Sequence, residues 1–447
     1  MNIQLRWFLL LGGVMFHLQG VAAGSGVTPE KIHLGSVLAL KGKAQGLGQS
    51  MRYGLNAALN GQQVGKRTVE IHYRNDSYEP SKTVPAVQKL IRQQQGIFLM
   101  VGNVGTPTAK VTLPMLKQER IPAVGFFTGA DILRPGKGDV INYRASYLQE
   151  TAAVIRQAIE QGGISTGQVC AYVQNDGYGM AGLQGVVAAL GQMGAQKQQL
   201  GALSQVLRKK GVNPARNYIG PVGVYRRNTR NVLNGYKSLK HWEEKSGYTC
   251  KMVVTVGAYD NIVHFVEQAR KSGESWLVSA VSFTGADHLH RQLKKKGLLK
   301  RVIMTQVVPL PEEKLPVIEA AKRALGSEFG LVSLEGYLVG KMVLNALQKM
   351  ESPPSRYHFL NAIRSSQYDL GGVEIDFTRN GYQGSDLVVT TVAGAKGFLR
   401  LVADSDSAGM GAVGALWWSG LPAGQSSTGR ERDGADGCPA RSQSARN

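Results

Sequence analysis

The chain has 447 residues, of which 43% are hydrophobic and 19% are charged. This composition excludes a disordered protein, and the length predicts two or more domains, each with its own hydrophobic core. A formal net charge of +21 raises the question of a nucleic-acid partner. However, the basic residues are scattered, and no zinc-finger or base-stacking motif accompanies their densest cluster, KKKGLLKR at 294–301. We interpret the charge as a solvated surface and expect no nucleic-acid partner.

The N-terminus has the layout of a secretory signal peptide. Arg6 precedes an apolar run from Trp7 to about Leu18, and the small residues VAA stand ahead of Gly24. The run is too short to span a membrane comfortably, and the small residues match what a signal peptidase cleaves. No cysteine follows it, so we expect no lipoprotein anchor. Residues 1–23 are therefore expected to be removed from an exported protein, with an uncleaved anchor as the alternative.

In the rest of the chain, β-prone apolar runs alternate with helical segments. The expected strands of the first half are at 32–39, 68–74, 97–101 and 121–125, with helices at 50–60 and 81–94 between them. The expected strands of the second half are at 168–174, about 197–203, 252–256 and 276–281. Strands separated by helix-length segments indicate parallel βαβ units. The pattern predicts an α/β protein with two similar lobes, each a doubly wound parallel sheet.

One repeated pentapeptide supports this duplication. FTGAD follows the fourth expected strand of each half, at 127–131 and at 283–287. The repeat predicts the same kind of turn in both places: a strand end, a bend rich in Thr, Gly and Asp, and a helix N-terminus.

The cysteines and histidines give no sign of a metal site. Cys170 lies in the apolar run QVCAYV and is expected in the core, while a bridge to Cys250 is left open. No CxxC or other metal-type spacing occurs. The eight histidines, which include His33 and His72, form no plausible metal cluster. We therefore expect no metal and no other cofactor.

The glycine-rich stretch LALKGKAQGLGQS at 38–50 does not fit a nucleotide site. A Walker loop needs Ser or Thr after its lysine, but Ala44 follows Lys43, and the glycines lack the dinucleotide-binding spacing. The chain also lacks a nucleophile elbow, an HExxH motif and a catalytic Ser-His-Asp arrangement. An enzyme is therefore disfavoured.

A non-catalytic binding site suits the architecture better. In open parallel sheets, ligands bind beyond the carboxyl ends of the strands, so two facing lobes would form a cleft there. Each loop at this edge leads into a helix N-terminus, which favours an anionic group. These loops supply hydroxyl and aromatic side chains at Thr106, Thr108, Thr128, Tyr178 and Tyr259.

At these loops the sequence resembles the type I periplasmic solute-binding proteins of ABC transporters, in the leucine/isoleucine/valine-binding branch. The resemblance covers roughly 27–400 and rests on the order of several motifs, among them DSYEPSKTVPAVQKLI, VGNVGTPTAKVTLPMLKQERIPAVGFFTGADILR, YRASYLQET, QNDGYGMAGLQGV and SLEGYLVG. It implies two α/β lobes that are joined by three crossings and close around a ligand.

The resemblance, together with composition, also suggests the domain boundaries. The first lobe is expected at 24–147 plus 306–372 and the second at 148–305 plus 373–401. Residues 402–447 are rich in Gly, Ala, Ser and Arg and are expected to form a disordered tail.

The resemblance further implies roles for single residues. Thr106 and Thr108 match the loop that binds the ligand carboxylate, and Thr128 and Gly129 match the loop that meets the ligand's head group. Tyr178 matches an aromatic residue that closes from the second lobe, and Tyr259 falls in or beside another ligand-facing loop. Each of these residues could instead only cap a helix or support a loop.

One position departs from the family pattern. Amino-acid binders of this family place an acidic residue after the fourth strand of the second lobe, where it pairs with the ligand's ammonium group. Here that position falls near Ser282. An unpaired buried ammonium is costly, so an amino-acid ligand requires Asp176, Asp260 or Asp287 as a substitute. A carboxylate, an amide or an aromatic acid fits equally well.

The expected function is capture of a small polar solute, such as an amino acid or a related carboxylate or amide. The protein is expected to be a periplasmic monomer that passes its ligand to an ABC permease in the cytoplasmic membrane. The alternative is a periplasmic sensor that reports its ligand to a membrane signalling protein.

Overall fold

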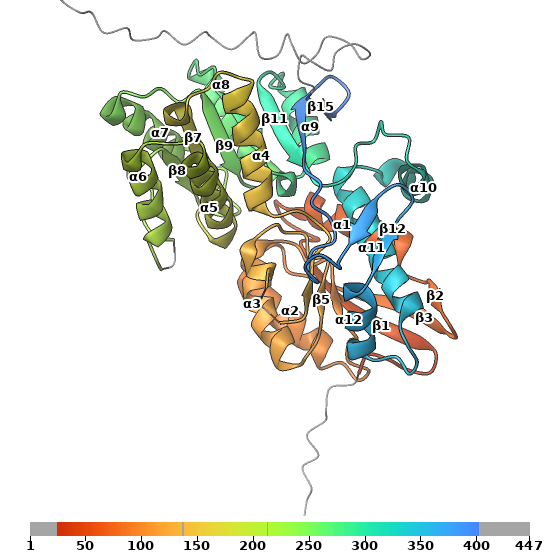
Figure 1. Cartoon of the computed structure of the whole chain (residues 1–447). Coiled ribbons are helices and arrows are strands. Elements are labelled where there is room, and N and C mark those ends of the chain that lie inside the picture. The colour runs from red at the N-terminus through yellow and green to blue at the C-terminus, as the bar shows by residue number, and fades with distance from the viewer. Residues whose placement is uncertain (1–24, 136–137, 212, 402–447) are drawn as a thin grey trace, which may run out of the picture.

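The computed structural model describes residues 25–135, 138–211 and 213–401. The chain forms two α/β bodies, one above the other in Figure 1. The expected signal peptide and the expected tail lie outside the described residues.

The first body is built on a sheet with the strand order β2-β3-β1-β4-β5-β6. Its strands are β1 (Lys31–Leu38), β2 (Gln63–Val64), β3 (Arg67–Asn75), β4 (Met100–Val101), β5 (Ala123–Val124) and β6 (Val140–Ile141). All neighbouring strands are parallel except β2 and β3. Its helices are α1 (Gln45–Ala58), α2 (Pro80–Ile91), α3 (Thr106–Gln118), α10 (Pro316–Leu325), α11 (Leu331–Lys349) and α12 (Arg356–Arg364).

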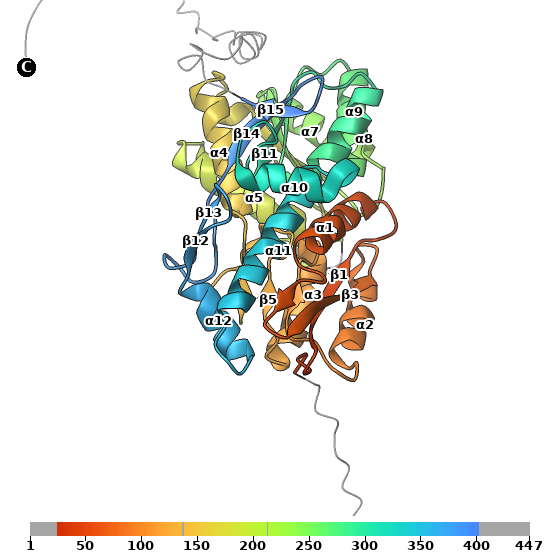
Figure 2. The same cartoon turned by 90° about the vertical axis from the view of Figure 1, so that its right-hand side faces the viewer.

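Helices α1 and α11 pack closely against each other (Figure 2). Gly54 on α1 makes this possible, because a Cβ atom there would lie 2.1 Å from the carbonyl oxygen of Ser333 on α11. The close contact attaches α11 to the first body, although α11 follows the strands of the second body in sequence.

The second body is built on a sheet with the strand order β15-β14-β11-β10-β9-β7-β8. Its strands are β7 (Val169–Gln174), β8 (Val222–Tyr225), β9 (Met252–Val256), β10 (Leu277–Ala280), β11 (Val302–Gln306), β14 (Val389–Ala393) and β15 (Phe398–Arg400). The pairs β11–β14 and β14–β15 are antiparallel, and all other neighbouring strands of this sheet are parallel. Its helices are α4 (Tyr147–Glu160), α5 (Gly177–Gln192), α6 (Lys197–Arg208), α7 (Leu233–Ser246), α8 (Tyr259–Lys271) and α9 (Ala286–Lys295).

The chain passes between the two sheets after β6, after β11 and before β14. The first and last of these crossings lie side by side, because the N–H groups of Gly384 and Ser385 donate to the carbonyl groups of Asn142 and Tyr143, both at 2.9 Å. A two-stranded ribbon of β12 (Gln367–Asp369) and β13 (Glu374–Asp376) precedes the last crossing. The expected fold class, two parallel-dominated α/β lobes, is confirmed.

Two local predictions were wrong. Residues 197–203 belong to helix α6, and the strand of this region is β8. Buried Leu203 and Val206 are three residues apart on α6, a helical spacing rather than the alternation of a strand. The two FTGAD segments also form different turns. Gly285 adopts a left-handed φ of 92° before α9, whereas the φ of Gly129 is not positive and the chain enters the short 3₁₀ helix η1 (Asp131–Leu133).

Cys170 and Cys250 form a disulfide with a Cα–Cα distance of 5.7 Å. Both residues are buried, so Cys170 is a core residue as well as a bridged one. The disulfide ties β7 to the segment that leads into the neighbouring strand β9. This answers the question that the sequence left open.

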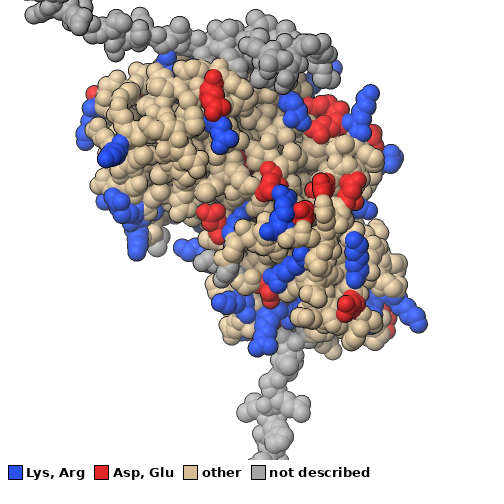
Figure 3. Space-filling view, in the orientation of Figure 1, with Lys and Arg blue, Asp and Glu red and all other residues tan. Residues whose placement is uncertain are grey.

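Surface charge follows the scattered pattern of the sequence. On the face shown in Figure 3, Lys and Arg side chains are spread over both bodies with Asp and Glu side chains among them. Within the described part of the chain, no helix has both the length and the apolar character that a membrane crossing requires.

Candidate functional site

Loops from the carboxyl ends of both sheets meet between the two bodies. Phe127 follows β5 of the first sheet and Phe283 follows β10 of the second, and their ring centroids are 5.1 Å apart. We call the loops after β4 and β5, represented by Thr106 and Thr128, the first wall. The second wall consists of Tyr178, Ser282 and Phe283, from the loops after β7 and β10.

The first wall carries a cluster of buried hydroxyl groups. Thr106 Oγ1 lies 2.7 Å from Thr128 Oγ1, which in turn lies 3.2 Å from Tyr147 Oη. Helix α3 begins at Thr106, and its N-cap is Gly105, which has no side chain to bond the first N–H groups. Glycine is required there, because φ is 98° and a Cβ atom would lie 2.1 Å from the ring of Tyr78.

Two further predicted residues support the first wall. Gly129 accepts a hydrogen bond from the Tyr147 N–H at 2.8 Å, and a Cβ atom at Gly129 would lie 2.8 Å from that nitrogen. Gly129 thereby lets Tyr147 approach Thr128. Thr108 Oγ1 donates to the carbonyl groups of Gly105 and Val104, so this hydroxyl binds its own helix start and lies outside the cluster.

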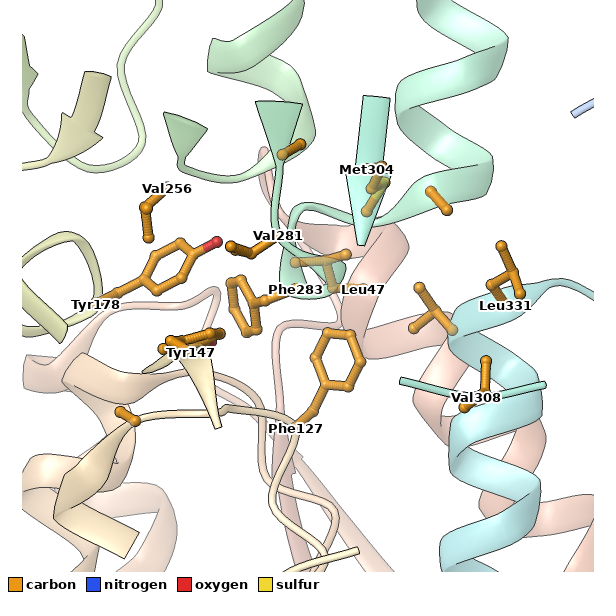
Figure 4. Packing of buried hydrophobic residues seen from close by; sticks show 14 of the residues in the cluster. Leu47, Phe127, Tyr147, Tyr178, Val256, Val281, Phe283, Met304, Val308 and Leu331 are labelled. Carbon is orange, nitrogen blue, oxygen red and sulfur yellow. The ribbon is translucent and has the colours of Figure 1, made fainter. Parts of the chain in front are cut away.

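The second wall is aromatic. Tyr178 stands at the start of α5, where its N–H donates to Asp176 Oδ1 at 3.0 Å. Its buried ring lies 5.3 Å from the Tyr147 ring and 4.6 Å from the Phe283 ring, measured between centroids. Figure 4 shows Phe283 between Tyr178 and Phe127. The Phe283 ring of the second wall therefore packs directly against Phe127 after β5.

A buried ionic network lies behind the second wall. The Ser282 N–H and Oγ donate to Glu150 at 2.7 and 2.9 Å, and Thr305 Oγ1 donates to the same carboxylate at 2.6 Å. Arg144 lies between two carboxylates, 3.4 Å from Glu150 and 3.4 Å from Glu335. An acidic side chain, Glu150, is thus present beside Ser282, but it comes from helix α4, after the first crossing, and its oxygens already accept protein hydrogen bonds.

Burial shifts the pKa of Glu335 more than its neighbours do, whereas at Arg144 the neighbouring charges prevail. Burial raises the pKa of Glu335 to about 7, although Arg144 beside it acts in the opposite direction. Burial alone would lower the pKa of the Arg144 guanidinium. The neighbouring Glu335 and Glu150 outweigh burial, so this pKa is raised. The guanidinium stands 5.0 Å over the Phe127 ring. The network therefore keeps one cation and its two acidic partners away from water.

The three aspartates that could substitute for the family's acidic residue all have protein partners. Asp176 accepts from Arg227 Nη1 at 2.8 Å, and Asp260 forms a two-pronged pair with Arg230. The Asp287 carboxylate faces the first two N–H groups of α11 and lies against Gly330. An ammonium group between the walls would have to displace one of these contacts.

Contacts at the rim join the two bodies. Tyr259 Oη accepts from the Gly46 N–H at 3.2 Å, and its ring stacks on His288 at 5.0 Å. Elsewhere on the rim, Arg227 pairs with Glu79 of the first body at 2.8 Å. Tyr259 therefore holds the start of α1 and does not join the hydroxyl cluster.

The structure brings Thr106, Thr128, Tyr178 and Ser282 to the place where the walls meet. Sequence reasoning missed several residues of the same place, namely Tyr78, Phe127, Tyr147, Glu150 and Phe283. The repeated FTGAD motif begins with two of them, Phe127 and Phe283, and was the signal that could have found them.

Comparisons with known proteins agree with this architecture. A family model described as periplasmic binding protein matches residues 31–204. A possible leucine/isoleucine/valine-binding protein from Rhodopirellula baltica SH 1 has 31% sequence identity and a TM-score of 0.75, over 88% of this chain and 98% of that chain. No curated protein matches the sequence.

Two more distant structures share the fold. A fatty acid ABC transporter substrate-binding protein from Thermomonospora curvata has 18% identity and a TM-score of 0.68, over 86% of this chain and 94% of that chain. An ABC transporter solute binding protein from R. palustris, in complex with 4-hydroxybenzoate, has 14% identity and a TM-score of 0.64, over 83% and 95% of the two chains.

Proposed function

The chain belongs to the periplasmic binding protein family, in its leucine/isoleucine/valine-binding group, and on this premise we propose that it captures a small carboxylate between its two walls for uptake by an ABC permease. Capture takes place in the periplasm, by a monomer, and without turnover of the ligand. The observation that carries the proposal is the buried hydroxyl cluster of the first wall facing the aromatic second wall.

The first wall suits the carboxylate end of the ligand. The first N–H groups of α3 have no partners within the helix, and the positive end of the helix dipole lies there. The Thr106 and Thr128 hydroxyls can donate to an anion, because hydroxyl groups rotate to suit their partner. Together these groups offer hydrogen-bond donors without a full positive charge.

The second wall suits an apolar body. Tyr178 and Phe283 present rings to the space between the walls, and the Phe283 ring itself occupies that space. A ligand that enters there exchanges the contact between Phe283 and Phe127 for contacts with its own surface. We therefore favour a carboxylate with a phenyl ring or an apolar chain. The ligands named for two of the similar structures, 4-hydroxybenzoate for the R. palustris protein and a fatty acid for the Thermomonospora protein, are of this kind.

The same site disfavours an ammonium group. Asp176, Asp260 and Asp287 all bind other protein groups, and Glu150 accepts hydrogen bonds from Ser282 and Thr305. A buried ammonium without a free carboxylate costs several kcal/mol. This argument narrows the sequence-based expectation from polar solutes in general to carboxylates without an amino group.

A ligand that contacts both walls should close the two bodies around it. A ligand biases the equilibrium between open and closed forms only by its higher affinity for the closed one. The rim contacts Arg227–Glu79 and Tyr259–Gly46 join the two bodies in the closed arrangement. A solution measurement should show compaction when ligand is added.

Mass spectrometry of the compound released on denaturing freshly purified protein tests the ligand class. We expect a stoichiometric carboxylate without an amino group, and small-angle scattering should show compaction when that compound is returned to the stripped protein. Release of an amino acid would contradict the ligand class and leave capture standing. A compound that binds without compaction would contradict the closing mechanism.

The partner is tested separately, by crosslinking the liganded protein to its neighbours in intact cells. Recovery of an ABC permease subunit is the expected result. Recovery of a membrane signalling protein in its place would favour the sensory alternative.

A further inference from the structure

Three side chains of metal-binding type meet on neighbouring strands of the first sheet. Strands β1 and β3 are parallel, with His33 opposite Glu70 and Gly35 opposite His72. Residues two apart on a strand point to the same face. The register therefore brings together two histidines that are 39 positions apart in the sequence, which the spacing of the histidines does not indicate.

The geometry of this cluster is compact. His33 Nδ1 lies 2.9 Å from His72 Nε2 and 3.9 Å from Glu70 Oε2, and one ligand atom of each residue lies within 4.8 Å of the other two. The two imidazole rings stack with centroids 5.2 Å apart. His33 is 6% exposed, while Glu70 and His72 are half-buried, so one side of the cluster is open to solvent.

From these distances we propose that His33, Glu70 and His72 form a Zn²⁺ site. Nitrogen and oxygen ligands bind zinc at about 2.0–2.2 Å, so in a tetrahedral site neighbouring ligand atoms lie about 3.4 Å apart. The two observed distances, 2.9 and 3.9 Å, lie on either side of that value. Small movements of these side chains complete three corners, and water takes the fourth.

Lys31 competes with the metal for Glu70. Its Nζ lies 2.7 Å from Glu70 Oε2, and the lysine is half-exposed. Zinc binding requires this ammonium group to leave, which a flexible exposed side chain does readily. Removal of Lys31 should therefore strengthen zinc binding, whereas removal of either histidine should weaken it.

The zinc site is separate from the cleft between the walls. The cluster lies in the first half of β1, whereas the walls follow the carboxyl ends of the strands. A bound ion would cross-link β1 and β3 of the first body. Zinc should then raise the thermal stability of the protein by preferential binding to the folded state and leave the capture of small molecules unchanged.

Isothermal titration calorimetry of the full mature chain, purified without a histidine tag, tests the site with Zn²⁺ as the probe. We expect one ion per chain, and Mg²⁺ should not replace it, because nitrogen ligands favour zinc. His72→Ala should weaken zinc binding by more than about 100-fold. Loss of a residue that only hydrogen-bonds to a metal ligand costs less than this. Lys31→Met should strengthen it.

Two controls separate the site from ordinary surface binding. His241→Ala removes an exposed histidine elsewhere and should leave zinc affinity unchanged. The melting temperature without zinc reports whether His72→Ala still folds. Absence of zinc binding to the parent protein, or equal affinity in the parent and His72→Ala, would overturn the proposal. An unchanged affinity in Lys31→Met would overturn the role of Glu70 as a ligand.

Discussion

The two FTGAD segments have the same five residues but different surroundings. Their first residues, Phe127 and Phe283, meet ring to ring between the two bodies. Their last residues differ: Asp131 is exposed, whereas Asp287 is partly buried and faces the start of α11. Each segment follows a strand that has a neighbour on both sides in its own sheet, so the difference arises beyond the sheet.

Neighbouring helices explain the difference. The first segment lies against the start of α4, where Thr128 joins the hydroxyl cluster with Tyr147. The second segment packs against α11, a helix of the first body, through Asp287. One segment therefore supplies a polar group to the proposed ligand site, and the other ties the second body to the first. Matched substitutions at the two segments can separate these roles.

The largest expected effect concerns Glu335, which lines a small cavity together with Phe127 and Ser282 of the two walls. Its pKa is raised from 4.5 to about 7, so the folded protein keeps the proton while the unfolded chain loses it. Stability should fall by up to about 3 kcal/mol as pH rises from 4.5 to 7. Glu335→Gln should abolish this part of the pH dependence.

Urea unfolding at pH 5 and pH 7 measures the effect as the difference between the parent protein and the variant. Titrating groups outside the buried network contribute equally to both proteins, so they cancel. Glu312→Gln, at an exposed position, is the control and should behave like the parent. Parallel pH profiles for Glu335→Gln and the parent would contradict the raised pKa.

The second largest expected effect is a difference in stability between variants of the two aspartates, Asp287 and Asp131. Asp287→Ala removes the partly buried carboxylate that faces the N–H groups at the start of α11, which should cost about 2 kcal/mol of unfolding free energy. Asp131→Ala changes an exposed residue and should cost less than about 0.5 kcal/mol. Chemical denaturation of the two variants measures both losses of unfolding free energy. Equal losses would contradict the different roles of the two segments.

The smallest expected effect is a difference in ligand affinity between variants of the two threonines, Thr128 and Thr284. Thr128→Val removes a hydroxyl of the first wall and should weaken the binding of 3-phenylpropanoate about tenfold, the cost of one hydrogen bond to a charged group. Thr284→Val, at the matching position of the other segment, should change the affinity less than about twofold. Calorimetry measures both, and an equal loss in both variants would remove the distinction between the segments.

The fold was predictable because it depends on local patterns. Alternating apolar runs and helices indicated two parallel sheets, and the one strand placed wrongly, at 197–203, is an amphipathic helix too short for its period to be decisive. The positions of Thr106 and Tyr178 at helix starts were predictable because strand ends and helix starts are local signals as well, whereas their contact with a ligand stays a prediction.

The rest of the site depends on contacts between distant segments. Glu150 comes from the helix after the first crossing and reaches Ser282, 132 positions later in the sequence. His33 and His72 meet only because the register of β1 and β3 aligns them. Spacing along one sequence contains no information on such pairings, so the buried network and the zinc site required the structure.

The most direct test of the account compares two probes that differ only by an amino group, 3-phenylpropanoate and phenylalanine. Calorimetry with the ligand-stripped protein should show that 3-phenylpropanoate binds at least about tenfold more tightly, because the carboxylates near the walls are already engaged. Tighter binding of phenylalanine would contradict the central claim that the site takes carboxylates without an ammonium group.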